Sequence, residues 1–559
     1  MRWLIGRMVT LLSDVWSCHS NKSVARLSLA SLIFTAPSLA VLAAGLLFWY
    51  PHSASAEPAT SPISDKFARY MDEFDATERA KVASVIIDAV TDDWILDNAP
   101  RFECPSPTIE KIYYFRWWTY RKHIRQTPHG RILTEFLLPV SHAGPYNSVS
   151  CALGHHLAEG RWLRDQAVLD EYLRFWLHSG PNGGPASHLH QFSSWLAAAV
   201  WDRYLVTGDH DGTVALLDDL IADYRRWQIE RQRPDGLFWQ YDVRDGMEES
   251  ISGDRRVENI RPTINAYMAA NACAIARIAE LADRPEAAAS FRAEAERLQS
   301  QLIDALWDRN AEFFKVRRPD GSLSDAREAI GFIPFTFNLA RPEHAVAWRQ
   351  LNDPQGFKAP WGITTAEQRH PQFRTHGTGT CEWDGAVWPF ATSQTLGGLA
   401  NVLRGPPQPY VTRGDFLEQM ENYARAHQQN GKPYIGEYHD EQTGEWLITD
   451  PKAERSRHYN HSTFNDLMIT GLVGLLPRAD DVIEVDPLLP PDAWDWFKLT
   501  DVPYRGHLVT TAWDRTGKQY GHGPGLSISV DGRELARSEK LKRLTVALPA
   551  PSPSSASVQ

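Results

Sequence analysis

The sequence predicts a mainly α-helical protein with a small β region at its C-terminal end and an apolar segment near its N-terminus. Apolar residues recur every three or four positions from about residue 66 to residue 478, which is typical of helices that bury one face. Short runs of β-forming residues follow, and residues 27–50 carry no charge. With 559 residues, the chain can bury a large core in one main domain with smaller attachments.

The N-terminal stretch is typical of a targeting segment. Residues 27–50, LSLASLIFTAPSLAVLAAGLLFWY, are long enough to cross a bilayer, and residues 1–26 form a basic flank that favours a cytoplasmic N-terminus. Residues 54–56, Ala-Ser-Ala, offer a signal-peptidase site within the linker 51–65, so a cleaved signal competes with an anchor. We expect the protein to be exported, in the periplasm or on the extracytoplasmic face of the inner membrane. The membrane would be contacted through this segment only.

The central region, residues 66–478, shows several helical segments separated by Gly, Pro and Asp. Residues 214–230 form one predicted helix, which ends before Pro234-Asp235-Gly236. Another begins at Arg261-Pro262, and a third covers residues 286–307 after a short break. Short connections between helices predict antiparallel hairpins, which pack as a bundle, a solenoid or a closed toroid. A solenoid is disfavoured because no repeat of fixed length is visible.

Residues 479–549 predict a C-terminal β domain of the sandwich type. Four β-type runs occur there, at residues 481–490, 507–514, 526–532 and 544–548. Residues 550–559 are rich in Pro and Ser and predict a disordered tail.

Composition narrows the classes of ligand. The chain has 58 Lys and Arg against 69 Asp and Glu, a net charge of −11, which argues against nucleic acid as a partner. Its 21 Trp and 18 Tyr suit stacking on sugar rings as well as core packing. The five cysteines are far apart, which predicts neither a metal site nor a disulfide framework but leaves one long-range disulfide open.

Two loops rich in acids, Gly and aromatics are candidates for catalysis. The first, residues 238–256, contains Asp245 and Glu248, and the second, residues 433–446, contains Glu437. Hydrolysis of a glycosidic bond needs one protonated acid on the leaving oxygen and one carboxylate that activates water or attacks carbon. Acids in loops also serve as helix caps and ion-pair partners, so the pattern alone leaves both interpretations open.

In this order and in a helical chain, both loops resemble the (α/α)6 glycosidases of the trehalase, glycoside hydrolase family 63 and mannosylglycerate hydrolase-like group. Gly246-Met247-Glu248 resembles the motif of the general acid, although the family has Asp where this chain has Glu248, and Asp245 is the alternative. Glu437-Tyr438 before Thr443-Gly444 resembles the segment of the general base. The resemblance implies that Glu248 or Asp245 is the acid, Glu437 is the base and Tyr438 contacts the sugar.

Two further stretches carry the resemblance, which covers nearly all of residues 100–478. Residues 381–396 resemble the segment that lines the sugar pocket and imply substrate contacts by Trp383, Gly385 and Trp388. Residues 458–476 resemble the last helix of the barrel and place Asn460 and His461 near the pocket.

The resemblance implies a fold and an activity. The fold is a mainly α (α/α)6 six-hairpin toroid over residues 66–478. The activity is that of an inverting, exo-acting α-glycosidase on an oligosaccharide or glycoconjugate, without a cofactor. Inversion would separate the two carboxyl groups by about 6.5 to 9.5 Å, which leaves room for a water molecule.

Arginine, histidine and tryptophan are concentrated in residues 115–124 and 154–162. We expect Arg116, Trp117, His155 and His156, together with Arg261 at the helix start, to bind sugar hydroxyls at the mouth of the barrel. A buried polar network between helices is the alternative. His155-His156 does not predict a metal site, because adjacent residues point in different directions from a helix and a third ligand is missing.

Two other classes of function compete with hydrolysis. An (α/α)6 polysaccharide lyase or sugar epimerase would use a Tyr or His base, and both residues are plentiful here. A non-catalytic glycan-binding envelope protein would keep the toroid without turnover. Product chemistry separates them, because a lyase leaves an unsaturated sugar whereas a hydrolase consumes water.

Overall fold

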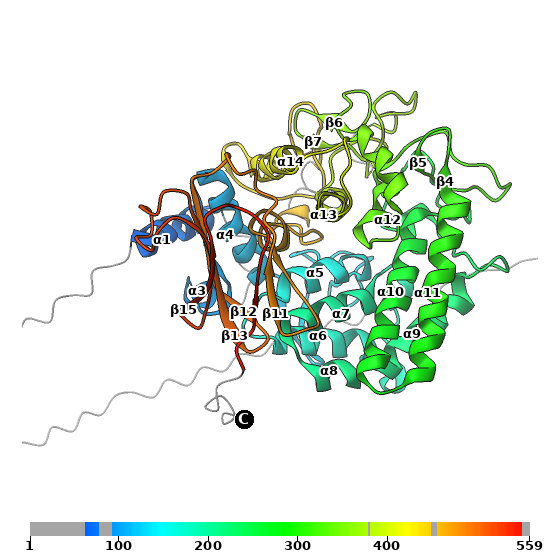
Figure 1. The fold of residues 1–559 in the computed structure, drawn as a ribbon. Coiled ribbons are helices and arrows are strands. Elements are labelled where there is room, and N and C mark those ends of the chain that lie inside the picture. The colour runs from blue at the N-terminus through cyan, green and yellow to red at the C-terminus, as the bar shows by residue number, and fades with distance from the viewer. Residues whose placement is uncertain (1–61, 78–91, 378–380, 449–454, 551–559) are drawn as a thin grey trace, which may run out of the picture. The chain divides into compact units, whose positions relative to one another are not determined.

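The structure is a computed structural model that describes residues 62–77, 92–377, 381–448 and 455–550. These residues all belong to one unit, Thr60–Gln559 (Figure 1). The predicted segments 1–26 and 27–50 lie outside the described residues, as does the tail from residue 551. In the part that is described, we find no helix with the length and apolarity needed to cross a membrane.

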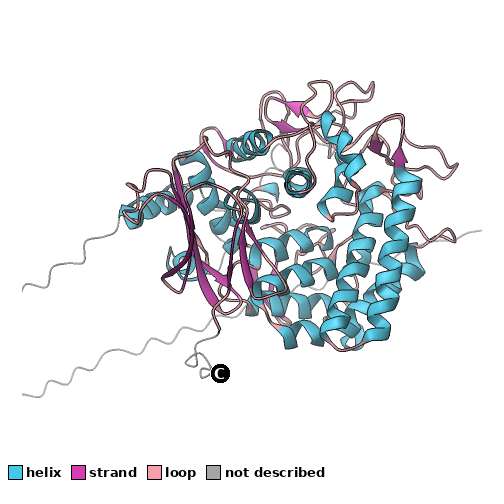
Figure 2. Ribbon diagram, in the orientation of Figure 1, coloured by secondary structure: helices cyan, strands magenta, loops and turns pink. Residues whose placement is uncertain are grey.

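Helices are the commonest regular structure in the described chain, and strands gather beside them (Figure 2). The mainly helical class is therefore confirmed, together with a strand-rich C-terminal region. The α-helices are α1 (Pro62–Asp75), α3 (Asp92–Asn98), α4 (Pro107–Lys122), α5 (Leu153–Gly160), α6 (Ala167–His178), α7 (Leu196–Thr207), α8 (His210–Ala215), α9 (Leu217–Arg231), α10 (Pro262–Leu281), α11 (Pro285–Leu306), α12 (Ile333–Thr336), α13 (Pro389–Arg404), α14 (Arg413–Ala426) and α16 (Asn465–Leu467).

The helix boundaries follow local signals in the sequence. α10 and α11 begin at Pro262 and Pro285, because proline fits the first helical turn, where its missing N–H is not needed. The helix predicted over residues 214–230 is divided, since α8 ends at Ala215 and α9 begins at Leu217. α9 ends at Arg231, just before Pro234-Asp235-Gly236.

Contacts between the helices form a closed circuit. α5 contacts α7, and contacts continue from α7 through α10, α12, α13 and α14 to α4. α16 touches both α4 and α5 and completes the circuit. α9 and α11 pack against α10 from outside this circuit, and Figure 1 shows α10 and α11 lying side by side.

The helix expected from the motif at residues 458–476 is much shorter than predicted. Only residues 465–473 are helical, as α16 followed by a π-helical turn over Met468–Val473. His458 has a φ of 56°, a left-handed conformation that a regular α-helix does not contain. Asn460 and His461 therefore lie in the loop that precedes α16.

Two antiparallel sheets form the β region. One has the order β1-β12-β13-β14-β15, and the other has the order β10-β11-β16. β1 lies between α3 and α4 in sequence and pairs with β12, so it joins the helical region to the C-terminal sheet. The strands are β1 (Arg101–Glu103), β10 (Leu475–Leu476), β11 (Val482–Val485), β12 (Trp496–Tyr504), β13 (His507–Asp514), β14 (Gly525–Val530), β15 (Arg533–Ser538) and β16 (Leu544–Ala547), besides the hairpin strands β2 (Ile124–Thr127), β3 (Gly130–Leu133), β4 (Trp307–Asp308), β5 (Phe313–Phe314), β6 (Lys358–Ala359), β7 (Gly362–Ile363), β8 (Gln428–Gln429) and β9 (Lys432–Pro433).

The four β-type runs correspond to β11, β13, β14 and β16, whereas sequence patterns missed β1, β12 and β15. β12 contains a bulge between Leu499 and Val502, which interrupts the alternation of buried and exposed residues. β15 is a polar edge strand with no buried residue. Its pairing with β14 holds it in place, and edge strands often carry charge. The apolar core runs without interruption from helix α4, at Trp117, into the sheets, at Phe497.

Candidate active site

The two acidic loops meet at one cavity, together with segments that are distant in sequence. The cavity has a volume of about 90 Å³, enough for several water molecules. It is lined by Glu135, His142, Val149, Cys151, Phe192, Gly246, Glu248, Cys381, Trp388, Phe390, Glu437, Arg455, Tyr459 and His461. Of the predicted site residues, Glu248, Glu437, Trp388 and His461 thus lie at the cavity, beside the glutamate Glu135, which was not predicted.

Glu248 enters the cavity from the loop that follows a single 3₁₀ turn at Asp242–Arg244. Gly246 turns this loop with a φ of 73°, and Met247 anchors it in the core. Loss of hydration raises the pKa of Glu248 to about 7, and the negative charge of Glu437 adds to the shift. Glu248 can therefore hold a proton near neutral pH, as a general acid must.

Glu437 lies in the same cavity in a different electrostatic environment. Arg455 Nη2 donates to Glu437 Oε2 at 3.0 Å, and the Ser456 hydroxyl donates to the same oxygen at 2.9 Å. Burial raises the pKa of Glu437, whereas Arg455 and Ser456 oppose the shift by stabilising the carboxylate. Two acids with unequal environments are what a proton donor and a proton acceptor require.

Glu135 is a third carboxyl group at the cavity. It follows strand β3, and the Tyr459 hydroxyl donates to its Oε1. Burial raises the pKa of Glu135 to about 8, with further contributions from the charges of Glu437 and Glu248. An acid between apolar residues in TEFLLP (134–139) is the signal that could have identified it.

An aromatic stack forms one wall of the cavity. The Trp388 ring packs between Trp383 and Tyr438, with ring centroids 4.6 and 4.5 Å apart. Trp388 lines the cavity, whereas Trp383 and Tyr438 stand behind it. The backbone N–H and C=O groups of Val387 and His439 exchange two hydrogen bonds of 3.0 Å, which join this stack to the loop of Glu437.

Gly385 has a structural role in this arrangement. Its φ is 153°, and a Cβ atom there would lie 2.5 Å from the ring of Phe373. Its N–H donates to the Thr365 hydroxyl, which in turn donates to the carbonyl of Ala386. Gly385 does not line the cavity. It allows the loop before Trp388 to turn close to the Phe373 ring, where a side chain would not fit.

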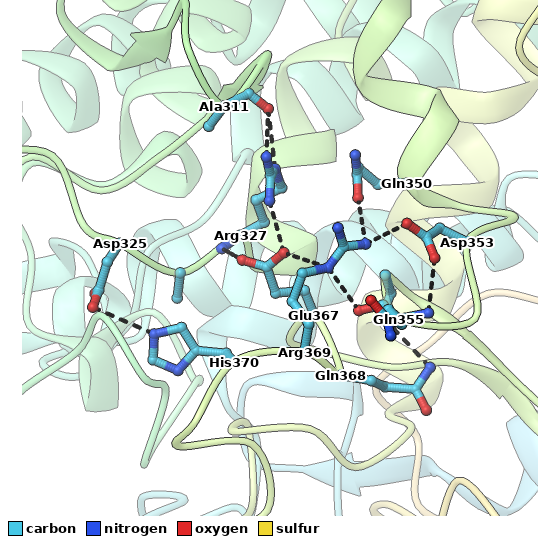
Figure 3. A network of polar contacts seen from close by, with 12 residues as sticks. Ala311, Asp325, Arg327, Gln350, Asp353, Gln355, Glu367, Gln368, Arg369 and His370 are labelled. Carbon is cyan, nitrogen blue, oxygen red and sulfur yellow. Dashed lines mark hydrogen bonds and ion pairs between the residues drawn. The ribbon is translucent and has the colours of Figure 1, made fainter.

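A polar network surrounds Glu367, two residues after Thr365 (Figure 3). Arg327 donates to both carboxylate oxygens of Glu367, through its backbone N–H at 2.9 Å and its Nη1 at 2.8 Å. Arg369 Nε lies 3.3 Å from the same carboxylate and donates to the carbonyl of Gln355. The Thr365 N–H donates to the carbonyl of Ala386, which joins this segment to the loop before Trp388.

The predicted contacts in α4 and α5 form a buried network that does not line the cavity. Arg116 donates to the hydroxyl and carbonyl oxygens of Ser462. Trp117 is completely buried in the core. His156 is hydrogen-bonded to the Tyr172 hydroxyl and the Asn460 carbonyl, and burial lowers its pKa to about 4. The His155 ring packs edge-on against two aromatic residues, Trp195 and Phe390.

Arg116 and His156 therefore contact the loop of residues 458–464, through Ser462 and Asn460. Asn460 belongs to the same network, since its side chain donates to the carbonyl of Thr134. His461 is the member that reaches the cavity, where its ring packs against Tyr459 at 4.0 Å.

Asp245 and Arg261 pair with each other away from the cavity. Arg261 Nε donates to Asp245 Oδ2 at 2.6 Å, and both side chains are fully buried. The Ser193 hydroxyl donates to the other carboxylate oxygen at 2.6 Å. This geometry supports Glu248 rather than Asp245 as the acid and gives Arg261 a structural role.

We expect Asp245→Asn to destabilise the protein by about 3 to 5 kcal/mol, because the buried Arg261 would lose the carboxylate to which it is hydrogen-bonded. Denaturant unfolding measures this loss. The control is Glu249→Gln, which removes the more exposed pair with Arg255 and should change the free energy of unfolding by less than about 1 kcal/mol. Unchanged stability of Asp245→Asn together with lost turnover would instead make Asp245 a reacting group.

The described residues contain no cluster of three or more His, Cys, Asp or Glu side chains that could hold a metal. The four described cysteines, Cys104, Cys151, Cys273 and Cys381, are free thiols, and Cys18 lies outside the described residues. The side chains that line the cavity supply carboxyl groups, an arginine, two imidazoles, two thiols and aromatic rings.

Comparison with known proteins identifies the family of this chain. Residues 145–462 match the mannosylglycerate hydrolase MGH1-like glycoside hydrolase domain, and residues 476–537 match the C-terminal domain of glycosyl hydrolase family 65. The chain belongs to the MGH1-like glycoside hydrolase family. The resemblance seen in the sequence and the assignment to the glycoside hydrolases are thereby confirmed.

Solved structures show the same fold. A protein described as "Sialidase" is 46% identical, with a TM-score of 0.83 over 86% of this chain. The chain spans only 44% of the length of that protein. A family 78 rhamnosidase of a Bacillus species is 13% identical, with a TM-score of 0.53 over 77% of this chain and 41% of its own. A family 63 mannosylglycerate hydrolase of Thermus thermophilus, in complex with Tris and D-glycerate, is 15% identical, with a TM-score of 0.50 over 64% of this chain and all of its own.

Proposed function

We propose that this protein is an inverting, exo-acting α-glycosidase that cleaves an oligosaccharide or glycoconjugate. The observation that carries the proposal is the meeting of Glu248 and Glu437 at one cavity in unequal electrostatic environments. Glu248, protonated near neutral pH, would protonate the leaving oxygen. Glu437, held as a carboxylate by Arg455, would take a proton from the attacking water.

The closed circuit of helix contacts supports an (α/α)6 toroid with the cavity at one end, where the loops that connect its helices meet. Trp388 is the member of the aromatic stack that lines the cavity, and the edge of its ring would contact the sugar. A small cavity bounded by loops favours removal of one terminal sugar over cleavage within a chain.

The charges at the cavity favour an uncharged sugar. Within the described lining of the cavity, Arg455 is the one Arg or Lys, and it is already paired with Glu437. A sugar carboxylate would therefore meet the negative charge of Glu437 beside an arginine that is already paired.

The test is hydrolysis of a panel of 4-nitrophenyl and reducing-end-labelled α-linked glucosides, mannosides, galactosides, rhamnosides and arabinosides, with a β-linked set as control. Proton NMR during turnover of the active substrate identifies the first anomer released. A β-anomer from an α-glycoside supports inversion, whereas an α-anomer indicates retention. An unsaturated product that absorbs ultraviolet light would indicate a lyase, and no release of sugar from any substrate would contradict the hydrolase.

Export belongs to the proposal and rests on the sequence of residues 27–50 alone. Fractionation of cells that express the full chain, compared with a chain starting at residue 57, tests it. Recovery of both chains in the cytoplasm would contradict export.

A further inference from the structure

Glu135 takes no part in the two-acid reaction, yet its carboxyl group lies at the same cavity as Glu248 and Glu437. Its own strand connection and the loop of residues 459–460 hold it there. It follows strand β3, its backbone carbonyl accepts a hydrogen bond from Asn460 at 3.0 Å, and its side chain accepts one from Tyr459. A buried acid placed so rigidly beside the reacting groups requires either a structural or a substrate-binding explanation.

The contacts of the two carboxyl oxygens favour substrate binding. Oε1 accepts from the Tyr459 hydroxyl, a strong donor. The neighbour of Oε2 is the Cys151 thiol at 3.7 Å, and a thiol is a weak donor. Buried carboxyl oxygens ordinarily have good partners, so Oε2 has bonding capacity left on the side of the cavity.

We propose that Glu135 is a third functional carboxyl group, which binds a hydroxyl of the sugar that is held between Glu248 and Glu437. The inference rests on the proposed glycosidase function and deepens it. A sugar hydroxyl can both accept and donate a hydrogen bond, so it can replace the weak thiol contact at Oε2. Glu135 would then help to determine which sugar epimer fits, because only one orientation of that hydroxyl reaches the carboxyl group.

The protonation of Glu135 is compatible with this role. Burial, together with the charges of Glu437 and Glu248, raises its pKa to about 8, so it carries a proton near neutral pH. A neutral carboxyl group donates one hydrogen bond and accepts another. It binds a hydroxyl without adding a second negative charge beside Glu437.

The experiment uses the full protein and the 4-nitrophenyl glycoside that it hydrolyses. We compare Glu135→Ala and Glu135→Gln with wild type on this glycoside and on its monodeoxy analogues, one for each ring hydroxyl. We expect Glu135→Ala to reduce kcat/KM about 10- to 100-fold, as for loss of a hydrogen bond to a charged or strongly polar group. Glu135→Gln should lose less, because the amide still donates and accepts.

The decisive readout is the dependence on one hydroxyl. For a single deoxy analogue, Glu135→Ala should cause little further loss, because the contact is already absent, whereas the other analogues should show the full loss. Equal losses on all analogues, or wild-type kinetics, would overturn the inference. Complete inactivity of wild-type protein on every glycoside would overturn the proposed function instead.

A matched control separates binding from folding. Glu159 is also a buried glutamate, but it accepts the backbone N–H groups of Phe464, Asn465 and Asp466 and does not line the cavity. We expect Glu159→Gln to lower thermal stability and to reduce kcat/KM by the same factor on every analogue. If Glu135→Ala gave that same uniform pattern, its role would be structural.

Discussion

Replacing Glu437 with glutamine is expected to reduce kcat about 10²- to 10⁴-fold, the usual contribution of a general base. The amide can still accept hydrogen bonds from Arg455 and Ser456, so the shape of the cavity should persist. It cannot take a proton from water, so the chemical step is lost while the sugar still binds. Steady-state kinetics on the active glycoside give kcat, and calorimetric titration with the released monosaccharide gives the binding.

A second glutamate of the same loop provides the control for Glu437. Glu441 is also buried, but its carboxylate faces Arg374 and does not line the cavity. Glu441→Gln should therefore keep kcat within a few-fold of wild type. Turnover retained by Glu437→Gln, or equal losses in the two variants, would contradict the role of Glu437 as the base.

Replacing Glu248 with glutamine is expected to give a loss that depends on the leaving group. An alcohol leaving group needs the proton of Glu248, so kcat should fall about 10²- to 10⁴-fold on a natural linkage. A 2,4-dinitrophenyl group leaves without protonation, so the loss on that substrate should be small. Adjacent Glu249→Gln is the control, because Glu249 pairs with Arg255 outside the cavity.

The pH dependence of kcat/KM should identify the same two groups. The acid must be protonated, and the pKa of Glu248 is raised to about 7, so activity should fall as the pH rises through about 7. The base must be ionised, so activity should also fall as the pH decreases through the pKa of Glu437. Burial raises this pKa, so the acidic decline should occur at a higher pH than the ordinary pKa of a glutamate. Glu248→Gln should abolish the alkaline decline, and persistence of that decline would assign it to another group.

The structure brings the two acidic loops predicted from the sequence to one cavity, at Glu248 and Glu437. It places the residues chosen for their chemical type elsewhere. Arg116, His155, His156 and Arg261 are buried and do not line the cavity. A side chain that binds a ligand and one that ties two loops together need the same polar groups, so residue type cannot separate these roles.

The residues that sequence reasoning missed share a physical cause. Glu135 and Arg455 are 320 positions apart, and neither belongs to a motif that the sequence shows. Their importance is electrostatic: the charge of Arg455 opposes the rise in the pKa of Glu437, and the charge of Glu437 raises the pKa of Glu135. Both effects depend on distance and burial rather than on sequence spacing. The same applies to β1, whose three residues become a strand only by pairing with β12.

The sequence by itself determined the local features of this protein: the helical class, the proline-started helices α10 and α11, four strands of the C-terminal region and the two acidic loops. Each depends on periodicity, turn residues or a short motif, which act over a few residues. The tertiary structure alone decided which acids share a cavity, which arginine pairs with Glu437 and which with Asp245, and that a third glutamate faces the same space. These depend on contacts between residues that are tens or hundreds of positions apart, and only packing brings such residues together.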